Sequence, residues 1–355
     1  MLYNTKNLHG GDVYGEKIIC DFSANINPFG TPASVTAAMQ AALCDACRYP
    51  DPYCRELVRA VSEYESVPRE YVLCGNGAAE LIYSYCAALR PALVLELAPT
   101  LSEYSLAAVI SGGEVRRFPL IKAKNFTLGE DFLTEIEKIR PNAVFLCSPN
   151  NPTGRLVSIE ITGAILRLCR KIGARLFVDE SFLELSGGRS AKGFLAEYPE
   201  LFVLKAFTKS FALAGVRLGY GLCSDAKLLE KMSRTVQPWN VSCIAQAAGT
   251  AALKEHDYLH KTREIVRTER VFLQEKLESL GFWVCPSEAN FLMFQGKPGL
   301  CEALSERGVA IRDCENFPYL GQGWYRAAVR LRDENEMLVN TLSELCGKEV
   351  AWQKI

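Results

Sequence analysis

The sequence predicts an α/β fold, with a mostly parallel central sheet in a large domain and a smaller α+β domain. Two observations carry this prediction. Through the middle of the chain, short apolar runs alternate with segments of helical periodicity, which is typical of parallel strands covered on both faces. The last third differs, because a long polar helix leads into strand-like stretches with helices between and after them. We therefore expect an N-terminal arm (1–30) that contributes to the small domain and active site, a large domain (31–255) and a C-terminal small domain (256–355).

The individual elements follow from local patterns. Residues 1–30 are irregular because glycines and an Asn-Pro pair interrupt them, and a helix should follow Pro32, where apolar residues recur at helical spacing. The expected strands of the large domain are Tyr71–Cys74, Ala92–Leu97, Ala143–Cys147, Arg175–Val178, Leu201–Leu204 and Leu218–Leu222, with a helix at Ser158–Ile172. In the last third, a helix should span about Glu255–Leu280, and strands should cover Trp283–Cys285, Asn290–Phe294, Val309–Arg312 and Tyr325–Leu331.

Composition excludes several classes of protein. The 355 residues carry a formal net charge of −1, which argues against nucleic acid or an anionic membrane as a partner. The N-terminus lacks an apolar signal core and no stretch reaches 18 apolar residues, so we expect a cytoplasmic protein without a membrane segment. Most of the 14 cysteines sit in apolar surroundings and should be reduced. The single CxxC, at Cys44 and Cys47, has no second pair beside it, so no metal site is expected.

Three charged residues in the middle of the chain suggest a ligand site. Asp179 follows a buried-looking strand, and the carboxyl ends of parallel strands are where open α/β sheets bind ligands. Lys209 follows another apolar run, where a free cation would be costly to bury and a Schiff base would remove the charge. Lys205 is an alternative four residues earlier. Arg217, eight residues after Lys209, is of the residue type that binds phosphate in a bidentate manner.

Two turn-rich segments lie upstream of these residues. The sequence SPNNPTG (148–154) follows the strand that ends at Cys147. The sequence GNGAAE (75–80) follows the strand that ends at Cys74 and opens a helix. Small residues at a helix N-terminus let backbone N–H groups approach a phosphate.

In this order, GNGAAE, SPNNPTG, a strand ending in Asp179 and TKSFALAGVRLGY (208–220) resemble the pyridoxal 5'-phosphate (PLP)-dependent aminotransferases of fold type I, class I/II. The resemblance covers nearly the whole chain and implies PLP as cofactor. It makes Lys209 the Schiff-base lysine, Asp179 the partner of the pyridine nitrogen and Asn151 a donor to the ring O3'. By the same resemblance, the phosphate of PLP is held by Gly77, Ala78, Thr208 and Arg217.

The resemblance also implies a homodimer with shared active sites, because Tyr49 matches a tyrosine that reaches the phosphate of the neighbouring subunit. The sequence departs from the family pattern at two positions. Ala206 stands where Ser or Thr usually contacts the phosphate, and Leu101 stands where an aromatic residue usually covers the pyridine ring. Either Leu101 packs there or Tyr104 contributes part of that surface.

Within the class, the chain resembles the threonine-phosphate decarboxylases of the cobalamin pathway first and the histidinol-phosphate aminotransferases next. HGGD (9–12) and DFSANINP (21–28) match the decarboxylases, as do PWNV (238–241) and Phe182, where aminotransferases usually have Tyr. This resemblance implies L-threonine O-3-phosphate as substrate and (R)-1-aminopropan-2-ol O-phosphate, a linker of cobamides, as product. The expected substrate-binding residues are His9, Gly10, Asn27, Asn151, Arg312, Arg326 and Arg330.

A substrate with a carboxylate and a phosphate needs two cationic anchors. Arg326 matches the arginine that grips the α-carboxylate. Arg330 lies four residues further, so on one strand the two side chains would point to the same side. Three alternatives stay open: a histidinol-phosphate aminotransferase, a decarboxylase that prefers L-serine O-phosphate, and a non-catalytic protein of the same fold. Serine phosphate stays open because one methyl group discriminates between two substrates by only about 1–3 kcal/mol.

Overall fold

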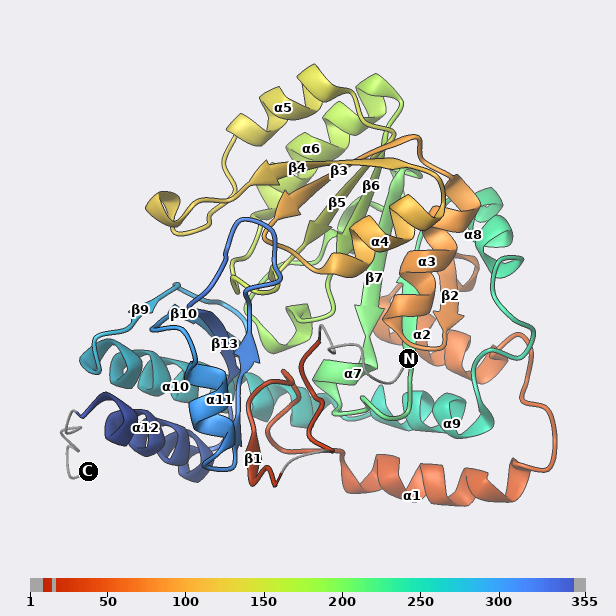
Figure 1. Cartoon of the computed structure of the whole chain (residues 1–355). Helices are drawn as coiled ribbons and strands as arrows, with labels where there is room; N and C mark the ends of the chain where they lie inside the picture. Colours follow the sequence, from red (N-terminus) through yellow and green to blue (C-terminus); the bar gives the residue numbers. More distant parts are fainter. Residues whose placement is uncertain (1–8, 15–16, 348–355) are drawn as a thin grey trace, which may run out of the picture.

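The computed structural model describes residues 9–14 and 17–347, so the first eight residues of the expected arm lie outside the described part of the chain. Its centre is a seven-stranded sheet in the order β2-β8-β7-β6-β5-β3-β4 (Figure 1). Only β8 runs antiparallel to its neighbours, which confirms the mostly parallel sheet. The strands are β2 (Val72–Gly75), β3 (Leu93–Ala98), β4 (Glu114–Pro119), β5 (Ala143–Cys147), β6 (Arg175–Asp179), β7 (Leu201–Ala206) and β8 (Gly219–Leu222).

Helices cover both faces of this sheet. Along the central strands, side chains alternate between two apolar cores, so that Val144 and Val178 face one core and Phe145 and Phe177 face the other. The sheet is therefore buried on both sides, as the continuous apolar runs of its strands predicted. The helices of this part are α1 (Ala33–Ala42), α2 (Arg55–Glu65), α3 (Ala78–Leu89), α4 (Ser102–Ile110), α5 (Asp131–Ile139), α6 (Ile159–Ile172), α7 (Phe207–Ser210), α8 (Ala226–Ser233) and α9 (Cys243–Ala252).

The rest of the chain forms a second layer of smaller sheets. The 24-residue helix α10 (His256–Ser279) leads to an antiparallel sheet in the order β12-β13-β10-β9, and β1 pairs in parallel with β11 (Figure 1). A third apolar core fills this part. Its other elements are β1 (Cys20–Asp21), β9 (Trp283–Val284), β10 (Phe291–Gln295), α11 (Leu300–Ser305), β11 (Val309–Ala310), β12 (Arg312–Asp313), β13 (Trp324–Ala328) and α12 (Arg332–Cys346).

Most predicted elements agree with the structure to within two residues, and the exceptions have physical causes. The edge strand β4 was not predicted, because its side chains are largely exposed and it shows no apolar run. The expected strand Val309–Arg312 is split into β11 and β12, which belong to different sheets. The expected strand Tyr325–Leu331 was too long, since β13 ends at Ala328. No helix among the described residues is long and apolar enough to cross a bilayer.

Candidate active site

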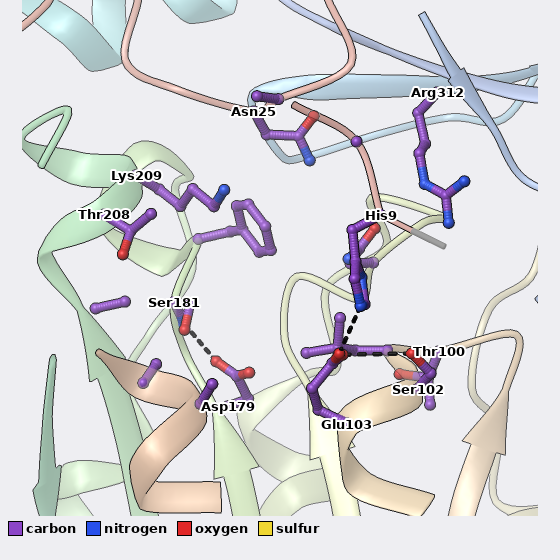
Figure 2. Close-up of a pocket in the computed structure, with 18 of the residues that line it drawn as sticks. His9, Asn25, Thr100, Ser102, Glu103, Asp179, Ser181, Thr208, Lys209 and Arg312 are labelled. Carbon is purple, nitrogen blue, oxygen red and sulfur yellow. Dashed lines mark hydrogen bonds and ion pairs between the residues drawn. The ribbon is translucent and has the colours of Figure 1, made fainter. Parts of the chain in front are cut away.

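A cavity of about 330 Å³ lies where the carboxyl ends of β5, β6 and β7 meet the smaller sheets. This is the end of a parallel sheet at which α/β proteins bind ligands. Figure 2 shows Lys209 and Asp179 on one side of it, with His9 and Arg312 on the other and Asn25 between them. Sequence regions that are 300 residues apart therefore line one site.

Lys209 supplies the amine of the cavity. It lies in the single-turn helix α7, directly after β7. Burial, followed by the positive charges of Arg326 and Arg217, lowers the pKa of Lys209 from 10.5 to about 8. The amine is thus closer to its neutral, nucleophilic form at physiological pH than an ordinary lysine.

Lys205, the alternative lysine, lies elsewhere. Its Nζ is buried 3.0 Å from Glu184, 3.4 Å from Glu180 and 3.4 Å from Glu65. Burial alone would lower the pKa of Lys205, but the carboxylates of Glu180, Glu184 and Glu65 outweigh it and raise the pKa. Lys205 is a protonated structural cation outside the cavity wall, so Lys209 is the only one of the two that can act there.

Asp179 supplies a buried carboxylate at the end of β6. Its Oδ1 accepts a hydrogen bond from the Ser181 backbone N–H at 2.8 Å, and its Oδ2 accepts one from the Tyr104 hydroxyl at 2.6 Å. Burial raises the pKa of Asp179, and the hydrogen bonds from Ser181 and Tyr104 oppose this shift. A cationic ring nitrogen beside this group would stabilise its ionised form.

Tyr104 therefore has a different place from the one the sequence suggested. Its ring is fully buried against Phe145, with centroids 5.4 Å apart, and it lies outside the cavity wall. Leu101, at the N-cap of α4, lines the cavity instead. Of the two residues suggested to cover the pyridine ring, only Leu101 lines the cavity. Tyr104 lies outside the cavity wall, where its hydroxyl contacts Asp179.

A cationic corner lies at the N-terminus of α3. Ala78, Thr208 and Arg217 line the cavity there, and Ala206 adds a methyl group where a hydroxyl would be usual. Gly77 is the N-cap of α3 at φ +82°, and a Cβ on it would come within 2.6 Å of Arg217 Nη2. Only glycine fits at this position, which brings the helix N-terminus and the guanidinium together.

Two arginines line the side of the cavity formed by the small sheet. Arg312 on β12 and Arg326 on β13 are direct antiparallel partners. The buried Arg326 donates from Nη1 to Asn151 Oδ1 and from Nη2 to the Ser23 carbonyl at 2.7 Å. Burial lowers the pKa of Arg326 to about 10, so it stays a cation at neutral pH. Arg312 donates to Asn316 Oδ1 at 2.7 Å.

Arg330 does not join these arginines. Since β13 ends at Ala328, the expectation that Arg326 and Arg330 share one side of a strand is wrong. Arg330 lies before α12, where its Nη2 is 2.7 Å from Glu334 Oε1, and it is outside the cavity wall. Its proposed contact with substrate stays an untested prediction.

The N-terminal arm contributes His9 and Gly10 to the cavity, as the sequence suggested, but Asn25 takes the place expected of Asn27. The Asn27 side chain donates to the Ser210 carbonyl at 2.8 Å and to Thr262 Oγ1 at 3.0 Å, outside the cavity wall. Asn25 is buried and lines the cavity, and neither polar atom of its side chain has a hydrogen-bond partner among the described residues. Such an amide needs a ligand or water to satisfy it.

Phe182 lies inside the cavity and Tyr49 lies at the surface. Phe182 lines the cavity, packs edge-on against Phe291, and lies 5.8 Å from Lys209 Nζ, measured to its ring centroid. Tyr49 lies outside the cavity wall, is 78% exposed and stacks on Trp239 with centroids 4.4 Å apart. In the structure of one chain Tyr49 is a surface residue, as a residue that serves a neighbouring subunit would be.

The residues present fit PLP. An amine with a lowered pKa, a buried carboxylate and a cationic helix N-terminus match the aldehyde, the pyridine nitrogen and the phosphate of PLP respectively. The unsatisfied amide of Asn25 shows that the cavity also holds polar capacity for a ligand. The fold and the cavity thus define a PLP-dependent enzyme of fold type I.

Comparisons with known proteins also identify this class of enzyme. The chain belongs to the aminotransferase class I and II family, whose model matches residues 17–342. It is 34% identical to a threonine-phosphate decarboxylase of Salmonella typhimurium over 91% of this chain and 90% of that protein. It is 32% identical to a histidinol-phosphate aminotransferase of Methanocella arvoryzae over 94% of this chain and 91% of that protein.

Solved structures show the same fold. The histidinol-phosphate aminotransferase of Clostridium acetobutylicum superposes with a TM-score of 0.87 at 28% identity, covering 93% of this chain and 99% of that one. The enzyme of Sinorhizobium meliloti in complex with pyridoxal-5'-phosphate gives a TM-score of 0.83 at 22% identity, covering 93% and 92%. Relatives of both activities are thus similar to this chain.

Proposed function

We propose that this protein decarboxylates L-threonine O-3-phosphate to (R)-1-aminopropan-2-ol O-phosphate, which serves cobamide biosynthesis, with PLP bound to Lys209. The observation that carries the proposal is the pair Arg312 and Arg326, which are cross-strand partners and both line the cavity that Lys209 lines. A substrate with two anionic groups requires two such cations. The similarity to the threonine-phosphate decarboxylase of Salmonella typhimurium supports the same choice.

Each residue has a role in this proposal. Arg326, held by Asn151 and Ser23, binds the α-carboxylate and sets its orientation. Arg312, with His9 and the unsatisfied amide of Asn25, binds the phosphate. Ala78, Thr208 and Arg217 hold the phosphate of the cofactor, and Asp179 pairs with its ring nitrogen.

PLP, when bound, supplies an electron sink for the electron pair left at Cα when CO2 departs. The substrate amine would replace Lys209 on the cofactor and so free the Lys209 amine. We assign to that amine the return of one proton to Cα as a general acid, because Lys209 lines the cavity. Arg326 decides which Cα bond is cleaved, because it sets where the carboxylate lies. Phe182 offers no hydroxyl at the position where aminotransferases of this class usually have Tyr, and this difference supports a lyase rather than a transferase.

The test incubates the holoenzyme separately with L-threonine O-3-phosphate, L-serine O-phosphate and histidinol phosphate, with and without 2-oxoglutarate. We expect CO2 from threonine phosphate without a keto acid, in equal amount to the amine product. Amino transfer from histidinol phosphate to 2-oxoglutarate without CO2 would instead identify an aminotransferase. Faster CO2 release from L-serine O-phosphate than from L-threonine O-3-phosphate would identify serine phosphate as the preferred substrate. A Lys209→Ala variant is the control for uncatalysed release.

We also propose that the protein is a homodimer whose sites are shared through Tyr49. The exposed stack of Tyr49 on Trp239 supports this arrangement. Sedimentation should give twice the mass of the chain, and Tyr49→Ala should weaken PLP binding. A monomer with full PLP affinity would contradict the proposal.

A further inference from the structure

Glu103 is a carboxylate in the wall of a cavity that we propose binds a phosphate. It stands in the first turn of α4, and its side chain is only 14% exposed, whereas that of His9 is 52% exposed. A bare carboxylate here would repel a dianionic group. The negative charge of Glu103 must therefore be directed at another group than the phosphate.

The contacts of Glu103 connect it to the arm. Its Oε1 lies 3.1 Å from His9 Nε2, and its Oε2 accepts a hydrogen bond from the Ser102 hydroxyl at 3.4 Å (Figure 2). The N-terminal position on a helix stabilises its negative charge. Glu103 is thus the more buried acceptor, and His9 is its more exposed partner.

The arm is shaped to bring His9 to this acceptor. The Gly11 N–H donates to Ser23 Oγ at 2.7 Å, and a Cβ on Gly10 would meet the Ser23 carbonyl oxygen at 2.4 Å. The backbone after His9 therefore runs directly along the segment that also binds Arg326 through the Ser23 carbonyl. The arm thus has two anchors, Ser23 for the backbone and Glu103 for the imidazole.

We propose that Glu103 is a positioning residue, which holds the His9 imidazole in the orientation that binds the phosphate monoester of the substrate. An imidazole that donates to a carboxylate from one nitrogen and to a phosphate from the other must carry both N–H groups. The Glu103 carboxylate accepts from one of these nitrogens, 3.1 Å away, and so leaves the other nitrogen to face the phosphate. This inference deepens the proposed function, because it assigns the group that orients the phosphate anchor.

The test uses a ligand pair that cannot be decarboxylated, O-phosphoethanolamine and ethanolamine, which differ by the phosphate alone. Binding to the holoenzyme is measured by calorimetry. Glu103→Ala should lower the affinity for phosphoethanolamine by about tenfold, the size of one lost charge-assisted contact. It should change the affinity for ethanolamine by less than about twofold. Glu103→Gln, which keeps an acceptor oxygen, should lie between the wild type and Glu103→Ala.

A double-mutant cycle distinguishes positioning from a general structural effect. His9→Asn should lower the affinity for phosphoethanolamine by a similar factor. Adding Glu103→Ala to His9→Asn should lower the affinity no further, because the carboxylate then has no imidazole to hold. The matched control is Glu264→Ala, which removes the exposed pair of His260 and Glu264 on α10 and should change neither ligand.

Three results would overturn the proposal. Glu103→Ala could lower the affinity for both ligands equally, or its loss of affinity could add to that of His9→Asn. The wild type could also bind phosphoethanolamine no more tightly than ethanolamine. The assay does not depend on turnover. Failure of the proposed function, seen as absence of CO2 release, is therefore distinguishable from failure of this inference.

Discussion

The lowered pKa of Lys209 predicts how fast the protein takes up PLP at different pH values. Only a neutral amine attacks the aldehyde of the cofactor. With a pKa of about 8, roughly one lysine in ten is neutral at pH 7, against about one in 3,000 for a pKa of 10.5, a ratio of about 300. Uptake at neutral pH should therefore be about 300-fold faster than at an ordinary lysine.

The assay removes the cofactor, adds PLP to the apoprotein between pH 6.5 and 10, and follows the visible absorbance of the bound cofactor. The rate should rise with pH and level off above a midpoint near 8. Arg326→Met removes a neighbouring cation but leaves the burial, so the midpoint should move upward. Arg59→Met, on the exposed face of α2, should leave it unchanged. A midpoint at 10 or above in the wild type would refute the reasoning.

Three further predictions concern residues around the cavity. Lys205→Met leaves the buried carboxylates of Glu65 and Glu180, and the partly exposed one of Glu184, without their shared cation. It should lower the free energy of unfolding by about 3–5 kcal/mol in a denaturant titration; an unchanged midpoint would contradict the ion cluster. Gly77→Ala places a Cβ against Arg217 at a φ that favours glycine, so equilibrium dialysis should show PLP affinity reduced at least about tenfold, or about 1.4 kcal/mol. Tyr104→Phe removes the 2.6 Å hydrogen bond to Asp179 and should weaken PLP binding by about 1.5–3 kcal/mol, with the cavity-facing Leu101 unaffected; wild-type affinity would show that Tyr104 only fills the core.

The large sheet could be predicted from the sequence because burial on both faces leaves continuous apolar runs. Asp179 was found for the same reason, since it ends such a run at the edge of the sheet where ligands bind. The strand β4 escaped prediction because an exposed edge strand leaves no such run. The position of the site thus followed from strand ends, which are local properties, whereas its cofactor was implied by the resemblance to the aminotransferases.

The side chains that complete the cavity could not be predicted in the same way. Asn25 and Asn27 are the same residue type, two positions apart. They differ because the Asn27 Oδ1 accepts a hydrogen bond from the Phe29 N–H in a local turn, which holds the Asn27 side chain outside the cavity. Arg330 was misplaced because nothing in its sequence marks the end of β13. The contacts of Glu103 with His9 and of Ser23 with Arg326 could not be predicted, because they join segments far apart in the chain.

The central claim is that Lys209, and not Lys205, carries the cofactor. Borohydride reduction of the holoenzyme attaches the pyridoxyl group permanently to the lysine that holds it, and peptide mass spectrometry then locates it. We predict the added mass on the peptide that contains Lys209, with none on Lys205. A pyridoxyl group on Lys205, or no labelled lysine in a protein saturated with PLP, would contradict the account.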